Sequence, residues 1–118
     1  MILADTSVWI DYFRSGNAEL RQLLEDGEVA VHPMVLGELA CGNLTRRDAT
    51  IHLLNALPKC EAAADSLVLQ AVETRRWFGS GIGWVDAHLL TASLLSRMPL
   101  LTTDMRLERL ARSMDTQR

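Results

Sequence analysis

The chain has 118 residues, of which 48% are hydrophobic and 23% are charged, and its formal net charge is −3. This is ordinary globular composition, and it excludes both a disordered chain and a polycation that coats nucleic acid. The length predicts a single domain over residues 1–118, because domains commonly contain ~100–200 residues. The opening residues lack a basic segment, the longest apolar run falls short of the ~18 residues of a membrane span, and two cysteines make no disulfide framework. We therefore expect a soluble, reduced, cytoplasmic protein without a membrane partner.

Apolar patterns and breaker residues predict strands that alternate with helices. Apolar runs at residues 2–4 and 99–102 do not alternate, which is typical of strands buried in a parallel sheet. Residues 28–32 alternate like a strand, and residues 60–62 are a weaker candidate. Helices are expected over about 7–14, 18–26, 33–42, 46–57, 65–78, 85–97 and 105–114, with Thr6 or Ser7, Asn17 and Asp65 as N-terminal caps. This order predicts an α/β fold with helices on both faces of a mostly parallel central sheet.

Four acidic residues are candidates for a functional site. Asp5 and Asp104 directly follow the first and last predicted strands, and ligands of such sheets bind beyond the carboxyl ends of the strands. Each could equally be a helix cap. Asp86 opens a helix that is apolar nearly all round, where a carboxylate without a partner is costly. The alternative is an acid of the first helical turn that the helix dipole stabilises. Glu38 lies in mid-helix beside Gly37; on its own it could be an ordinary exposed glutamate, and Gly37 suggests that something approaches the helix closely.

Considered together, these acids predict a cation site. Oxygen ligands are what Mg²⁺ prefers, and without the four acids the chain carries 12 basic and 11 acidic residues, so the excess negative charge belongs to the candidate site. Clustered carboxylates suit metal-assisted hydrolysis of a phosphodiester, in which the cation activates water, stabilises the leaving oxygen and orients the phosphate. A non-catalytic α/β binding module is the alternative from another class.

Two other enzyme classes fit the sequence poorly. A phosphate-receiver domain needs paired early acids and a lysine near the last strand, whereas the single lysine, Lys59, precedes a mid-chain helix. A haloacid-dehalogenase phosphatase needs a second aspartate two residues after its nucleophile, and Ser7 stands at that position.

Four short motifs follow one another in the chain. They are Asp5-Thr6-Ser7-Val8, Glu38-Leu39-Ala40-Cys41-Gly42, Asp86 at the start of an Ala/Leu-rich helix, and Leu101-Thr102-Thr103-Asp104. In this order and spacing they resemble the opening signature, the Glu-Leu-x-x-Gly helix, the third acid and the closing strand end of the PIN-domain ribonucleases. The resemblance covers essentially the whole chain. Small single-domain members of that family are typically VapC-like toxins of type II toxin–antitoxin pairs.

This resemblance implies a three-layer PIN-like domain and an endoribonuclease that depends on Mg²⁺ or Mn²⁺. It further implies an RNA substrate, a cognate antitoxin that blocks the cleft, and a homodimer. The implied catalytic and metal-binding acids are Asp5, Glu38, Asp86 and Asp104. Thr6, Ser7 and Thr102 are implied as polar support for the cofactor site. We expect no protein nucleophile, with water attacking in line and leaving a 5′-phosphate.

Several other residues have competing interpretations. The histidines His32, His52 and His88 match no metal-ligand spacing, so structural or surface roles are expected. Trp77 and Phe78 are candidates for exposed anchors of a partner protein, because aromatic residues are enriched at interfaces. The candidates for RNA contact are Arg46, Arg47, Arg75 and Arg76, although each pair could also be a solvated helix face.

Overall fold

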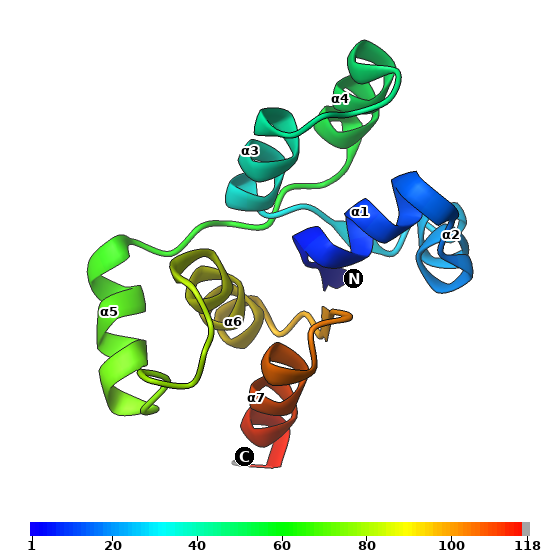
Figure 1. Ribbon diagram of the computed structural model, residues 1–118. Coiled ribbons are helices and arrows are strands. Elements are labelled where there is room, and N and C mark those ends of the chain that lie inside the picture. The colour runs from blue at the N-terminus through cyan, green and yellow to red at the C-terminus, as the bar shows by residue number, and fades with distance from the viewer. Residues whose placement is uncertain (117–118) are drawn as a thin grey trace.

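Three short parallel strands form the centre of the molecule, and helices surround them (Figure 1). The computed structural model describes residues 1–116. The strands are β1 (Ile2–Ala4), β2 (Val29–Ala30) and β3 (Leu100–Leu101), in the spatial order β2-β1-β3. Leu3 of β1 lies opposite Ala30 on one side and Leu100 on the other, both in parallel register. The first apolar run of the sequence is therefore the central strand, as its lack of alternation predicted.

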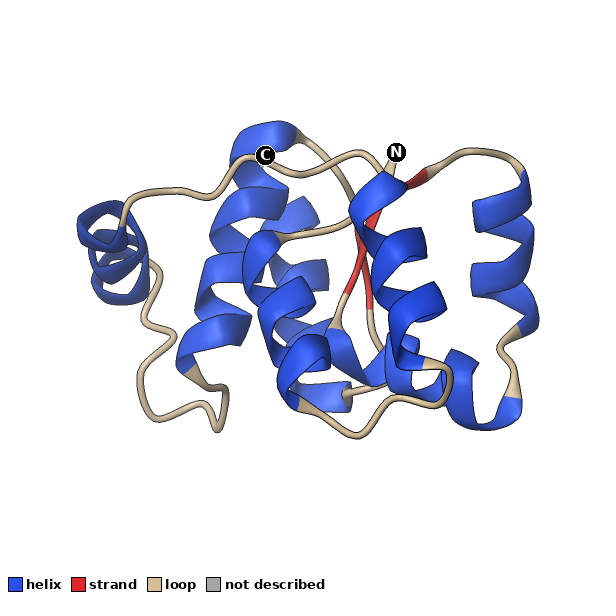
Figure 2. Ribbon diagram, turned by 90° about the horizontal axis from the view of Figure 1, so that it is seen from above, coloured by secondary structure: helices blue, strands red, loops and turns tan. Residues whose placement is uncertain are grey.

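Helices cover both faces of this sheet (Figure 2). They are α1 (Thr6–Ser15), α2 (Ala18–Glu25), α3 (Pro33–Cys41), α4 (Arg47–Ala56), α5 (Asp65–Thr74), α6 (Trp84–Ser96) and α7 (Met105–Thr116). Successive residues of a strand point to opposite faces. Ile2 and Ala4 belong to a core cluster drawn mainly from α1 to α4, together with Leu89 of α6, whereas Leu3 clusters with Ala92 of α6. The predicted three-layer α/β architecture is confirmed.

The helix α6 is the most buried of the described helices. Its seven successive residues from Ala87 to Ser93 are buried, because the sheet lies on one side of it and α5 and α7 pack on the others. The ring of Trp77 packs in a core cluster with Ala87 and Leu90 of this helix, and Trp77 is only 3% exposed. The expectation that Trp77 is an exposed anchor is therefore wrong, whereas Phe78 is exposed. The chain reverses at Arg76, whose φ is 58°, and this turn directs Trp77 inward.

The helix boundaries explain further differences from the sequence expectations. Asp5 caps α1, which confirms the capping interpretation of this acid, because its carboxylate accepts a hydrogen bond from the Val8 amide; Thr6 and Ser7 are already helical. Asn17 caps α2 as predicted, with its side-chain oxygen 2.9 Å from the Leu20 amide. The N-cap of α5 is Ala64, which makes no side-chain capping bond, and Asp65 is already helical. This helix ends at Thr74, ahead of the predicted residue 78, because the left-handed residue 76 follows.

The segment that links α4 to α5 forms less sheet than expected. Val31 and Lys59 make one isolated parallel bridge, and residues 60–62 are not a strand. His32, the residue after Val31, caps α3. Its imidazole Nδ1 accepts a hydrogen bond from the Met34 amide at 3.0 Å. Burial, together with the nearby His88, lowers the pKa of His32 to about 4, so the ring is neutral and able to accept this bond.

One edge of the sheet remains open within residues 1–116. The amides of Leu3 and Asp5 donate to the carbonyls of Pro99 and Leu101, so these two residues of the β3 segment face β1. The peptide groups of Leu100, between them, face the opposite direction. No described strand pairs with that outer side of β3.

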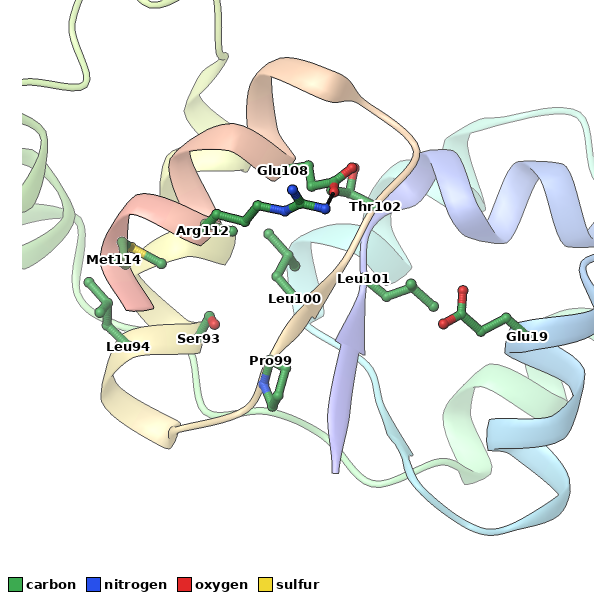
Figure 3. A pocket seen from close by; sticks show the side chains of 11 residues that line it. Glu19, Ser93, Leu94, Pro99, Leu100, Leu101, Thr102, Glu108, Arg112 and Met114 are labelled. Atoms are coloured by element: carbon green, nitrogen blue, oxygen red, sulfur yellow. Dashed lines mark ion pairs between the residues drawn. The ribbon is translucent and has the colours of Figure 1, made fainter. Parts of the chain in front are cut away.

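A hollow of about 370 Å³ lies along this open edge. Figure 3 shows Leu100 and Leu101 in it, with Glu19 on the side of α2 and the Glu108–Arg112 ion pair on the side of α7.

Among the described helices, none combines the length and apolar character needed to cross a membrane.

Candidate active site

Asp5 is the most constrained acid of the structure. It follows β1 directly and is only 4% exposed. Its Oδ1 accepts hydrogen bonds from the Ser7 hydroxyl at 2.6 Å and the Val8 amide at 3.1 Å. Its Oδ2 accepts from the Thr102 hydroxyl at 2.5 Å. A buried carboxylate is stable only when such donors replace water, so both the α1 cap and the far strand hold Asp5 in place.

Hydroxyl groups join the ends of β1 and β3. The Thr102 hydroxyl donates to Asp5 and also accepts from the Asp104 amide at 3.0 Å. Ser7 makes the parallel connection, because its hydroxyl lies 2.9 Å from the hydroxyl of Thr103 and accepts from the Thr103 amide at 3.3 Å. The two connections bring residues that are 96 or 97 positions apart in the sequence to one place.

Glu38 reaches the same place from a separate element. It lies on the exposed side of α3, and its Oε1 accepts a hydrogen bond from the Thr6 hydroxyl at 2.6 Å. Thr6 is the first residue of α1, so the bond ties the glutamate to the end of β1. The neighbouring Gly37 has open space where a Cβ would lie. The expectation of a close approach at that glycine is therefore wrong.

Asp86 lies in the first turn of α6 and is half-buried. Burial raises the pKa of this carboxyl group, and the negative charges of Asp5, Asp104 and Glu38 raise it further. These effects outweigh the opposite effect of the Gly83 amide, which donates to Oδ2 at 3.2 Å. The charged form of Asp86 is therefore disfavoured first by burial and then by the three neighbouring acids.

Asp104 stands where β3 leads into α7. Its Oδ1 accepts hydrogen bonds from the amides of Arg106 at 2.9 Å and Leu107 at 3.3 Å, so it caps the helix. Its other oxygen makes no hydrogen bond to the described residues and stays available to a ligand. The structure therefore supports the capping interpretation of Asp104 and also brings this acid to the shared site.

A shared cleft of about 370 Å³ collects these acids at the carboxyl edge of the sheet. It is lined by Asp5, Thr6, Ser7, Glu38, Gly83, Trp84, Val85, Asp86 and Asp104. Six of the seven residues singled out in the sequence line it, and the seventh, Thr102, stands behind Asp5. Trp84 and Val85 were not predicted to be part of the site, although their position just before Asp86 was a signal.

The donor set of the cleft fits a hard divalent cation. Four carboxylates meet there without a basic side chain in the lining, and none of them takes part in an ion pair between described residues. Within residues 1–116, no three side chains of Asp, Glu, His or Cys lie close enough together to hold one ion by themselves. The four carboxylates line the cleft without surrounding a common point. Mg²⁺ usually needs only one or two carboxylates beside its waters and substrate phosphate, so the chemistry of the residues present suits it.

One arginine packs on the loop that leads into the cleft. The side chain of Arg106 lies across Gly81, in the loop that leads to Asp86, and a Cβ on Gly81 would be 2.6 Å from Nη1. Gly81 has a φ of +92°, a conformation that favours glycine. Because the contact joins positions 25 residues apart in the sequence, a local pattern does not predict it.

Fold and cleft together define an α/β protein with an acidic site at the carboxyl ends of parallel strands. The family model described as "PIN domain" matches residues 2–113. The chain belongs to the PIN domain family, and the resemblance found in the sequence is confirmed.

Comparisons with individual proteins agree with this assignment. The chain is 43% identical over 109 residues to Ribonuclease VapC32 of Mycobacterium tuberculosis, in strains CDC 1551 / Oshkosh and ATCC 25618 / H37Rv; the match covers 92% of this chain and 88% of the relative. The crystal structure of PAE2754 from Pyrobaculum aerophilum superposes with a TM-score of 0.63 at 18% identity, covering 92% of this chain and 84% of that chain. This second likeness supports the fold alone.

Proposed function

We propose that this protein is an endoribonuclease and the toxin of a type II toxin–antitoxin pair. The observation that carries the proposal is the 43% identity to Ribonuclease VapC32 over 92% of the chain. The acidic cleft supports it, since clustered carboxylates at strand ends suit the hydrolysis of a phosphodiester. A protein of this class hydrolyses RNA in the cytoplasm and is silenced by a cognate antitoxin that covers the cleft. We also propose that it acts as a homodimer.

We further propose that Asp5, Asp86, Asp104 and Glu38 hold Mg²⁺ or Mn²⁺. When bound, such a cation supplies positive charge for the scissile phosphate and lowers the pKa of water. The protein would orient this site through Thr102 and Ser7, which fix Asp5, and through Thr6, which fixes Glu38. Asp104 and the half-buried Asp86 line the same cleft, and the second carboxylate oxygen of Asp104 accepts no hydrogen bond from the described residues.

Water is the proposed nucleophile. Thr6 and Ser7 carry the hydroxyl groups of the cleft lining, and both donate their protons to carboxylates. Neither has a histidine or lysine beside it in the lining that would activate it. Attack by water on the phosphorus, with departure of the 3′-oxygen, leaves a 5′-phosphate. Detection of a 2′,3′-cyclic phosphate would contradict this step.

The decisive experiment is cleavage of total RNA by the purified protein, free of antitoxin, in MgCl₂ or MnCl₂. EDTA and the Asp5→Asn variant should abolish discrete cleavage, whereas Glu73→Gln, on the exposed side of α5, should not. Asparagine can still cap α1, so loss of activity in a folded Asp5→Asn protein reports on the site. A folded wild-type protein that cleaves no RNA and gains no thermal stability from either metal would instead support a non-catalytic binding module.

A further inference from the structure

A second hollow opens beside the acidic cleft. It has a volume of about 410 Å³ and lies between α1 and the loop that follows α3. Its walls include Ile10, Phe13 and Arg14 from α1, and Asn43 and Leu44 from the loop. We call it the α1–loop groove.

Glu38 belongs to the lining of both the α1–loop groove and the acidic cleft. The Thr6 hydroxyl donates a hydrogen bond to Glu38 Oε1 at 2.6 Å. This bond fixes the position of the wall that the two hollows share. A polymer that lies in the cleft and continues past Glu38 therefore enters the groove with its next unit. This continuity points to part of the substrate as the occupant.

The groove offers three different chemical surfaces. Ile10, which is 43% exposed, and the half-buried Leu44 give it apolar walls. One face of the Phe13 ring stacks on Trp9, with centroids 5.7 Å apart and an angle of 26°, which makes the ring a rigid part of the wall. Asn43 is exposed and supplies an amide that can both donate and accept hydrogen bonds.

Arg14 supplies the positive charge that the cleft lacks. It is exposed in the last turn of α1, and the ion pairs between described residues do not include it. Its guanidinium suits a phosphate, because its N–H groups form a fork that matches phosphate oxygens. A nucleotide has a partner for each of these groups. The faces of its base pack on apolar walls, the edge of the base forms hydrogen bonds with an amide, and its phosphate binds a cation.

We propose that the α1–loop groove is a nucleotide subsite, which takes the unpaired base next to the cleaved bond on the Glu38 side of the cleft. Ile10, Phe13 and Leu44 contact the base, Asn43 reads its edge, and Arg14 contacts the adjoining phosphate. This inference rests on the proposed ribonuclease function of the cleft. An apolar segment of a protein partner is the competing occupant, and Arg14 together with the shared Glu38 wall favours RNA.

The test uses an RNA of nine nucleotides centred on a bond that the wild-type protein cleaves in total RNA. Abasic ribonucleotides replace each position in turn, and kcat/KM is measured in MnCl₂. We expect one position beside the cleaved bond to lose about tenfold when its base is removed, as is typical of base stacking on apolar side chains. In the Leu44→Ala and Ile10→Ala variants the intact RNA should be cleaved about tenfold more slowly, and removing that base should have no further effect.

Two further variants separate the contacts. Arg14→Gln should raise KM and make binding less sensitive to salt, while leaving the abasic profile unchanged. Leu69→Ala, an exposed leucine of α5, is the matched control and should behave as the wild type does. Circular dichroism and thermal unfolding confirm that each variant is folded before its kinetics are compared.

The outcomes distinguish this inference from the function on which it rests. Cleavage with an abasic profile that is the same in wild type, Leu44→Ala and Ile10→Ala would overturn the subsite and leave the ribonuclease standing. The same conclusion holds if these variants lose affinity only for the antitoxin protein, because the groove would then bind a protein. A folded wild-type protein that cleaves no RNA would overturn both proposals together.

Discussion

Replacing Thr102 with valine tests whether hydroxyl groups hold the acidic site together. Valine keeps the branched shape and the strand preference of threonine, but it removes the hydroxyl that donates to Asp5 Oδ2 at 2.5 Å and accepts from the Asp104 amide at 3.0 Å. Asp5 keeps its two other donors, Ser7 and the Val8 amide. The change therefore isolates one bond to a buried carboxylate.

The expected loss follows from the type of bond. A hydrogen bond to a charged group contributes about 1.5–3 kcal/mol to the free energy of unfolding, and Asp5 is only 4% exposed. We expect Thr102→Val to lose about 2 kcal/mol in EDTA, a large share of the ~5–15 kcal/mol that stabilises most domains. Thr102→Ser keeps the hydroxyl and removes one half-buried methyl group, so it should lose less than about 1 kcal/mol.

Urea unfolding measures both variants, with the fluorescence of the buried Trp9 and Trp77 as the signal. The midpoint should fall in Thr102→Val at an unchanged slope, and kcat/KM on RNA should fall further than in Thr102→Ser. A valine variant within about 0.5 kcal/mol of wild type, which is the range of ordinary surface substitutions, would refute the reasoning. Equal losses for valine and serine would do the same, because the methyl group and not the hydroxyl would then matter.

Four further expectations follow from the structure. Burial, followed by the neighbouring carboxylates, raises the pKa of Asp86 above its ordinary 3.8, so ionisation of this carboxyl group destabilises the folded protein as the pH rises above that value. In EDTA at pH 7, Asp86→Asn should therefore resist urea better than wild type, and this gain should vanish at pH 3. MgCl₂ or MnCl₂ should raise the Tm of wild type more than that of Asp86→Asn in a thermal scan. Trp77→Ala should cost about 3–5 kcal/mol, whereas Phe78→Ala, on an exposed side chain, should change the free energy of unfolding by less than about 0.5 kcal/mol. Gly81→Ala should lower the free energy of unfolding by about 1–2 kcal/mol, because the φ of Gly81 is +92°. Gly37→Ala should raise it by about 1 kcal/mol, because Gly37 lies on a helix with open space around it. Equal losses at the two positions would contradict the different backbone conformations described for them.

The sequence was sufficient for those features that local chemistry decides. The unalternating run at residues 2–4 indicated a buried central strand, and Asn17 indicated the start of α2. The four acids were predicted to converge because parallel strands end at one edge of a sheet. All four line one cleft in the structure.

Contacts between distant segments decided the rest. Nothing near Trp77 in the sequence shows that the left-handed turn at Arg76 directs its ring into a core with Leu107. No local pattern shows that the Thr102 hydroxyl, 97 residues later in the chain, donates to the Asp5 carboxylate. The α1–loop groove likewise depends on how two elements meet, and such geometry has no local pattern.

The open edge of β3 bears on whether copies of this protein stick to one another. An uncovered strand is a template for pairing with another chain, and long, flat, apolar edges aggregate. This edge is two residues long, only Leu100 directs its peptide groups outward from it, and it is flanked by the charges of Glu19 and Arg112. A strand added from another molecule would gain few hydrogen bonds and would have to strip water from both charges. The short, charge-flanked edge of β3 is therefore a poor template for pairing with the strand of another molecule.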